Sequence, residues 1–210
     1  MKEVILASAS ERRSRILADC GIAHKVIPSS VKEETHEKRH VSESVQLNAE
    51  AKAEKVAAAN KGSIIIGADT LVVHGEDIIG KPGGEDAARE MLRKFSGSEI
   101  EVYTGLCVIN PEGRPAGNGA GISNRTSRKA AGFEKSSLLV VPLSESRAER
   151  YFQLLAPYDK AGGFSIEGVG SMLFDNIKGS YFNILGLPMI KLGEVFSRAG
   201  LDILDHISKR

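Results

Sequence analysis

The chain has 210 residues, of which 41% are hydrophobic, and its 28 basic and 27 acidic residues give a formal net charge of +1. This length is enough to bury a sizeable core, and the balanced charge provides no overall positive field for nucleic acid or an acidic membrane. The apolar runs are too short for a signal peptide or a bilayer span, and two cysteines, Cys20 and Cys107, indicate a reducing compartment, so we expect a cytoplasmic protein.

Short apolar runs alternate with stretches of helical periodicity, which favours an α/β sandwich around one large sheet. The first strand, at residues 4–7, leads through Ser10 as N-cap into a helix that Gly21 ends near Cys20. Further strands are expected at residues 25–29, 63–73, 78–79, 99–110, 136–143, 162–168 and 171–177. Further helices are expected at residues 42–60 with Ser42 as cap, after Gly84 through residues 88–95, at 144–155, and at 188–207 with an interruption near Gly200.

Two segments break this alternation. Residues 31–41 are charged and aperiodic, so we expect a loop there. Residues 110–132 are rich in Gly, Arg and small side chains, and a connection of this length is unusual in a compact domain. We therefore predict one domain over residues 1–210 that carries a long, mobile or functional Gly-rich loop at about 110–132.

Three arginines, Arg12, Arg13 and Arg15, lie in the first turns of the first predicted helix. A helix N-terminus carries partial positive charge, so basic side chains are unfavourable there unless an anion binds. Backbone N–H groups and two guanidinium groups would together suit a polyphosphate, and the hydroxyls of Ser8 and Ser10 add donors. The alternative is an ordinary Ser N-cap with arginines paired to surface acids, and the turn lacks the Gly-Lys-Ser/Thr of a P-loop.

Lys52 is a basic residue on an apolar helix face. It shares a narrow stripe of the predicted helix 42–60 with Val45, Ala49 and Val56. A lysine facing inward needs a partner, and one interpretation is a cation directed into a site. The alternative is a side chain that snorkels to solvent at the helix edge.

Asp69 ends the apolar run "IIIGAD", where a buried carboxylate is costly unless it is paired or bound to a metal. Together with Glu33 or Glu34 it could hold Mg²⁺, with Mn²⁺ as the alternative, because Mg²⁺ takes one or two carboxylates and completes its shell with water and substrate phosphates. A turn aspartate that caps backbone N–H groups is the structural alternative. Lys81 lies at another sharp turn, before Pro82.

Six motifs occur in a fixed order: "LASASERR", "KAEKV" after a long predicted helix, "GADT" followed by "GKP", "YTG", "DKAGGFSIEG" and "GSYFNILGLP". Together they resemble the Maf family of nucleoside triphosphate pyrophosphatases, also called septum-formation-inhibitor proteins, from about residue 3 to about residue 195. The resemblance implies a Maf/ITPase-like α/β fold, in which helices flank a central mixed β-sheet and leave a cleft for a nucleotide. It also implies a divalent-cation-dependent hydrolysis of a nucleoside triphosphate to the monophosphate and pyrophosphate. It also implies a cytoplasmic protein that is often a homodimer.

The resemblance also assigns site residues. Asp69 matches the proton acceptor, Lys52 and Lys81 match further catalytic positions, and Glu33 joins Asp69 as a metal ligand. The residues that would bind the substrate are Ser8, Arg12, Arg13, Thr70, Asp159, Lys160 and Glu167.

Three of these positions determine substrate specificity in the family, and they correspond to Arg12, Thr70 and Glu167. The first two resemble the branch that cleaves dTTP and UTP, which usually carries Gln at the third position. Glu167 instead resembles the branch that acts on 7-methyl-GTP. We therefore expect a dTTP/UTP-type or broadened base preference.

The alternative function is a non-catalytic nucleotide-binding regulator of septum formation that acts through a protein partner. Such a protein would need the phosphate cradle but not the carboxylates. The presence of both Glu33 and Asp69 favours the enzyme.

Overall fold

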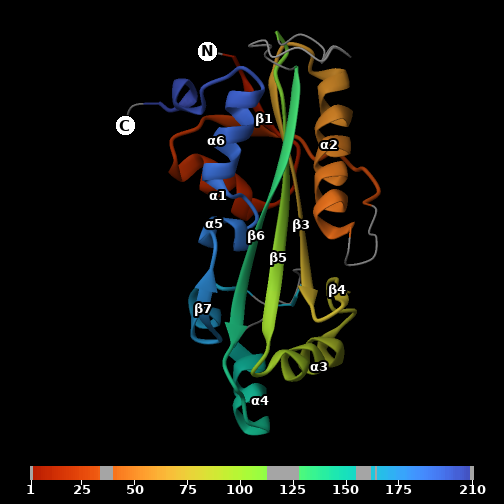
Figure 1. Cartoon of the computed structure of the whole chain (residues 1–210), viewed down its shortest axis with the longest axis vertical. Coiled ribbons are helices and arrows are strands. Elements are labelled where there is room, and N and C mark those ends of the chain that lie inside the picture. Colours follow the sequence, from red (N-terminus) through yellow and green to blue (C-terminus); the bar gives the residue numbers. More distant parts are fainter. Residues whose placement is uncertain (1, 34–39, 113–127, 155–161, 164, 209–210) are drawn as a thin grey trace.

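The computed structural model describes residues 2–33, 40–112, 128–154, 162–163 and 165–208. Its strands form a mixed seven-stranded sheet (Figure 1). The strands are β1 (Val4–Leu6), β2 (His24–Val26), β3 (Ile64–His74), β4 (Asp77–Ile79), β5 (Glu99–Ile109), β6 (Lys129–Val140) and β7 (Phe174–Lys178). The predicted fold class, a central mixed sheet flanked by helices, is confirmed.

The sheet combines a short parallel part with a long antiparallel part. Its strand order is β2-β1-β3-β5-β6-β7, and β4 pairs with the outer half of β3. The strand β1 runs parallel to both β2 and β3, whereas from β3 through β5 and β6 to β7 each strand is antiparallel to its neighbour. The long strand β3 therefore belongs to both parts, and Asp69 lies near its middle, opposite Gly105 of β5.

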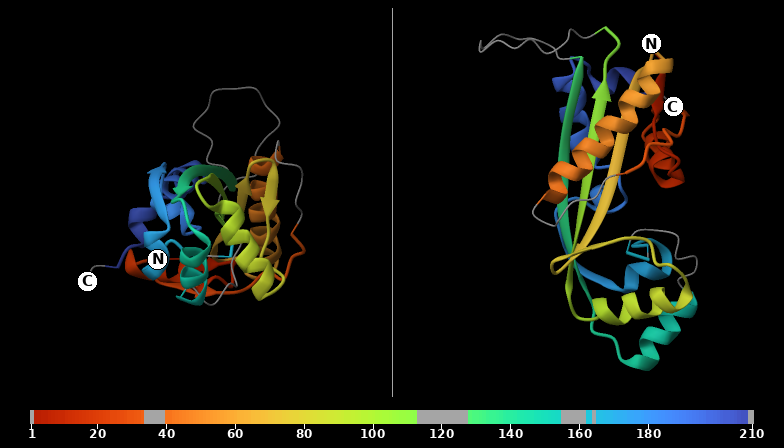
Figure 2. Two further views of the ribbon diagram at one scale, coloured as in Figure 1. Left: turned by 90° about the horizontal axis from the view of Figure 1, so that it is seen from below. Right: turned by 90° about the vertical axis from the view of Figure 1, so that its right-hand side faces the viewer.

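Helices cover both faces of the sheet. They are α1 (Glu11–Asp19), α2 (Val41–Ala59), α3 (Glu85–Phe95), α4 (Glu145–Leu154), α5 (Tyr181–Ile184) and α6 (Met189–Arg198), with 3₁₀ turns η2 (Gly168–Met172) and η3 (Ile203–His206). Helices α2 and α6 lie on opposite sides of the long strands, and α3 and α4 pack together at one end of the molecule (Figures 1 and 2). Across the described residues, no helix combines the length and apolar character that crossing a bilayer requires.

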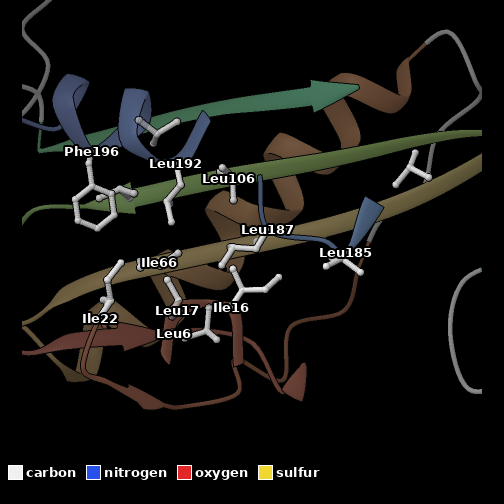
Figure 3. Close-up of a cluster of buried hydrophobic side chains, with 14 of the residues drawn as sticks. Leu6, Ile16, Leu17, Ile22, Ile66, Leu106, Leu185, Leu187, Leu192 and Phe196 are labelled. Carbon is white, nitrogen blue, oxygen red and sulfur yellow. The ribbon is translucent and has the colours of Figure 1, made fainter. Parts of the chain in front are cut away.

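Alternation along the strands divides the core between the two faces. Leu6 and Ile66 join Leu17 of α1 and Phe196 of α6 in the larger cluster, which Figure 3 shows. The neighbouring residues of the same strands point the other way, against Ala49, Ala53 and Val56 of α2. Cys107 is buried on this second face, where burial raises the pKa of its thiol, as expected for a core cysteine.

The elements at the N-terminal end follow the predictions most closely. Ser10 caps α1, as predicted, and Gly21 follows that helix with a positive φ of 75°. The cap predicted at Ser42 is wrong, because α2 already begins at Val41 and no side chain caps it; within its first turn the Ser44 hydroxyl donates to the carbonyl of His40.

Two other predictions also need correction. The described residues of the segment 162–168 form no strand, because the backbone at Gly162, Gly163 and Gly168 has a positive φ, which is incompatible with a β-strand. Residues 113–127 of the predicted Gly-rich loop lie outside the described residues, and the prediction is wrong for residues 129–132, which belong to β6. Their small side chains fit a strand covered on both faces, since Ala130 packs on one core cluster and Ala131 on the other.

Gly67 and Gly105 bring α2 unusually close to the sheet. A Cβ atom at Gly67 would lie 2.1 Å from the carbonyl oxygen of Ala49, and one at Gly105 would lie 2.1 Å from that of Val45. The strand β3 runs through Gly67 without interruption, from Ile64 to His74. The glycine therefore serves close helix–sheet packing, which sets how far α2 side chains reach over β3.

We expect Gly67→Ala to lower the free energy of unfolding by about 1–3 kcal/mol, because the added methyl group forces α2 away from the sheet. Gly62→Ala is the control, since a Cβ atom there meets nothing within 4 Å. Urea unfolding of both variants measures the difference. Equal stability of the two variants would contradict this account of the packing.

Candidate functional site

A cavity of about 980 Å³ lies where α1, α2 and β3 come together. The predicted site residues that line it are Ser8, Arg12, Arg13, Glu33, Lys52, Asp69, Thr70 and Lys81. Its other end is apolar and includes Phe95, Val102, Leu138 and Phe174. The cavity therefore has a strongly charged part and an apolar part, which suits a ligand with an anionic end and a less polar end.

Lys52 connects two carboxylates within the charged part of the cavity. Its Nζ lies 2.6 Å from Oδ1 of Asp69 and 2.6 Å from Oε1 of Glu33. Asp69 and Lys52 are 3% and 8% exposed, whereas Glu33 is exposed. The lysine thus points into a site, and its position on the apolar stripe of α2 is explained by ion pairs rather than by snorkelling.

Asn48 is a site residue that sequence reasoning missed. It is buried on α2, one turn before Lys52, and its Nδ2 donates to Oδ2 of Asp69 at 2.9 Å. The carboxylate is therefore held at both oxygens, by a charged partner and by a neutral one. The spacing could have identified it, because Asn48 lies four residues before Lys52 and therefore on the same side of the helix.

Arg13 is buried, and the protein itself engages most of its guanidinium group. Nε donates to the carbonyl of Gly186 at 2.8 Å, Nη1 donates to Ser8 Oγ at 2.8 Å and to the carbonyl of Ala68 at 3.0 Å, and Nη2 donates to Thr70 Oγ1 at 2.8 Å. Burial lowers the pKa of this guanidinium, and the nearby Asp69 carboxylate opposes that effect. Arg13 therefore joins α1, β3 and the segment after α5 at the cavity wall.

A chain of hydrogen bonds continues from Thr70 through the sheet. Thr70 Oγ1 lies 2.9 Å from Thr104 Oγ1, which donates to the carbonyl of Asn183 at 3.1 Å. The Asn183 amide in turn donates to the carbonyl of Val102 and to Ser136 Oγ. Thr104 and Asn183 lie in the motifs "YTG" and "GSYFNILGLP", but the sequence did not predict these contacts, because they join residues more than 30 positions apart.

Arg12 and Lys81 lie at more open parts of the cavity. Arg12 is half-buried, and its Nη1 donates to Ser165 Oγ at 3.5 Å. Lys81 is exposed on the connection between β4 and α3. Both cations line the same cavity as Lys52, so positive charge approaches it from three separate segments of the chain.

Among the remaining predicted residues, the structure describes only Glu167. Glu167 is not among the residues that line the cavity, and its carboxylate forms an ion pair with Arg15 of α1. Asp159 and Lys160 lie outside the described residues. Their predicted contact with substrate therefore stays a prediction.

The donor chemistry of Glu33 and Asp69 fits a hard divalent cation. Their carboxylate oxygens converge on one position, which the Lys52 ammonium group occupies. Among the described residues there is no group of three or more His, Cys, Asp or Glu that could hold a metal by itself. Two carboxylates suit Mg²⁺ that also binds substrate phosphates, because Mg²⁺ is usually held by few protein ligands.

Comparison with known proteins finds a matching family model, relatives that align along almost the whole chain, and solved structures with partial similarity. A family model described as "Maf-like protein" matches residues 3–199. The "dTTP/UTP pyrophosphatase" of Caldicellulosiruptor bescii is 36% identical over 97% of this chain and 98% of its own, and that of Dictyoglomus thermophilum is 39% identical over 97% and 99%. The solved structure of the Staphylococcus aureus Ham1 protein is similar over 67% of this chain and 72% of its own, with 16% identity and a TM-score of 0.42.

Proposed function

The chain belongs to the Maf-like family, and we propose that it is a nucleoside triphosphate pyrophosphatase, which converts a nucleoside triphosphate and water to the monophosphate and pyrophosphate. The observation that carries this proposal is the convergence of Glu33 and Asp69 on Lys52 inside a cavity that Arg12 also lines. The names of full-length relatives support the same activity.

The reaction forms a bond from a water oxygen to the α-phosphorus and breaks the bond from that phosphorus to the bridging oxygen. Asp69 accepts the proton of the attacking water, since it is the buried carboxylate in the cavity. Arg12, Lys52 and Lys81 neutralise charge on the triphosphate, most of which leaves as pyrophosphate. Mg²⁺ or Mn²⁺, held by Glu33 and Asp69, would supply further charge neutralisation at the phosphates.

Pyrophosphate release tests the activity directly. Purified protein is incubated with each common triphosphate and Mg²⁺, and inorganic pyrophosphatase converts the product to phosphate, which malachite green detects. We expect pyrophosphate and monophosphate in equal amounts. Tight nucleotide binding without release from any triphosphate would instead favour the non-catalytic regulator of septum formation.

The base preference that we propose is for dTTP and UTP, with broader acceptance than usual. Arg12 and Thr70 match the pyrimidine-type positions, and both line the cavity. Glu167 departs from that type, and its ion pair with Arg15 holds the carboxylate away from the cavity lining. An exposed ion pair contributes only about 0–1 kcal/mol, so substrate can displace it.

We expect Glu167→Gln to raise kcat/KM for UTP relative to GTP by roughly tenfold or more, because the amide offers a donor to a uracil carbonyl. Arg15→Gln is the matched variant, since it releases the Glu167 carboxylate without changing it. A freed carboxylate accepts the adjacent N–H groups of guanine, so this variant should shift the ratio the opposite way. Unchanged ratios in both variants would mean that Glu167 does not contact the base.

Three further properties belong to the same proposal. We propose that residues 1–210 form one domain, that the protein is cytoplasmic, and that it forms a homodimer. Light scattering of the purified protein measures the oligomeric state, and limited proteolysis measures the number of domains.

A further inference from the structure

The buried amide of Asn48 has no place among the residues that the proposed reaction uses. It donates to Oδ2 of Asp69 at 2.9 Å, and both residues are almost completely buried. A buried amide is costly unless its hydrogen bonds are made, so an apolar residue would fit this stripe of α2 more easily. Asn48 therefore calls for an explanation beyond packing.

The two oxygens of Asp69 have different surroundings. Oδ1 lies 2.6 Å from Lys52, which lines the cavity, whereas Oδ2 is bonded to Asn48, which does not line it. Lys52 is also bonded to Glu33, so its ammonium group is shared and would be drawn towards a bound triphosphate. Asn48 does not line the cavity, so a bound ligand would not compete with Asp69 for its amide.

The position of Asn48 is itself fixed by the fold. Gly67 and Gly105 allow the backbone of α2 at Val45 and Ala49 to approach the sheet directly. Asn48 lies between these two contact points in the sequence, on a part of the helix that has little freedom to shift. The Cα atom of Asn48 therefore has a fixed position relative to β3, and its side-chain amide can hold Asp69 in one orientation.

We propose that Asn48 is a positioning residue, which holds Oδ2 of Asp69 so that Oδ1 faces the attacking water and the phosphates. This inference rests on the proposed pyrophosphatase activity. It predicts that loss of the amide impairs the chemical step and leaves substrate binding intact, because Asn48 is not part of the cavity lining.

The test compares Asn48→Leu, which fills a similar volume without the donor, with Ser44→Ala as control. Ser44 is equally buried on the same helix and is bonded within it, to the carbonyl of His40. We expect Asn48→Leu to lower kcat roughly 10- to 100-fold, the usual cost of losing an outer hydrogen bond to a site group, with KM changed less than threefold. Affinity for a non-hydrolysable triphosphate should also stay within threefold, and Ser44→Ala should retain normal kcat.

A kcat within twofold of wild type in Asn48→Leu would overturn the proposal, as would equal losses of kcat and of affinity for the non-hydrolysable analogue. Asn48→Ser serves as a second variant if the leucine variant does not fold, with the same loss of kcat expected. Failure of the proposed function is a separate result, because the wild-type protein would then release no pyrophosphate from any nucleotide.

Discussion

Asp69→Asn is expected to lower kcat by roughly 10²-fold or more, because the amide cannot accept the proton of the attacking water. The exchange keeps the shape of the side chain, and Lys52 keeps its ion pair with Glu33. We therefore expect the variant to fold and to bind a non-hydrolysable triphosphate. Single-turnover kinetics at saturating nucleotide measures the chemical step directly.

Asp77→Asn is the matched control for this exchange. Asp77 is an exposed carboxylate on β4 that pairs with Lys94 and is not among the residues that line the cavity. Its loss should leave kcat unchanged, since an exposed ion pair contributes little. Near-normal turnover in Asp69→Asn would show that Asp69 takes no part in the reaction and that its burial has only a structural role.

Lys52 and Asp69, which sequence reasoning identified from local pattern alone, share one property: each is a charged group among residues that are otherwise apolar. Lys52 lies on an apolar helical stripe and Asp69 ends a β-branched run, and the structure places them 2.6 Å apart. Such conflicts between local pattern and residue type mark functional sites, because burial of charge needs a reason. The α/β architecture around one large sheet followed from the alternation of strands and helices in the same direct way.

Features that depend on contacts between distant segments could not be predicted. Gly67 has the same local signature whether a strand bends or a helix approaches it, and only the position of α2 decides between them. The ion pair of Arg15 with Glu167 joins residues 152 positions apart. Asn48 carries no charge, so it attracted no attention although it contacts the same carboxylate as Lys52.

Arg12 and Arg13 illustrate the same limit at neighbouring positions. The sequence predicts both as phosphate ligands, since both follow the cap of α1. Successive residues on a helix point about 100° apart, so one of the pair turns into the protein while the other faces outward. Arg13 is the buried one, with four hydrogen bonds to the protein, whereas Arg12 is half-buried at the cavity.

We therefore expect Arg13→Ala to reduce stability as well as activity. It removes the hydrogen bonds that the guanidinium donates to Gly186, Ala68 and Thr70, and a hydrogen bond that involves a charged group contributes about 1.5–3 kcal/mol. A total of at least about 3 kcal/mol corresponds to a Tm lower by roughly 6–12 °C for a chain of this length. Calorimetry of Arg13→Ala and Arg12→Ala measures this difference.

Arg12→Ala should change Tm by less than about 2 °C, because surface substitutions usually alter stability by no more than about 0.5 kcal/mol. It should instead lower the affinity for a non-hydrolysable triphosphate far more than the affinity for the monophosphate, since a cation at the cavity mainly contacts the β- and γ-phosphates. If Arg13→Ala melts like the wild-type protein and loses only triphosphate affinity, its hydrogen bonds to Gly186, Ala68 and Thr70 contribute nothing to stability. Arg13 would then act as a phosphate ligand, as the sequence alone predicts.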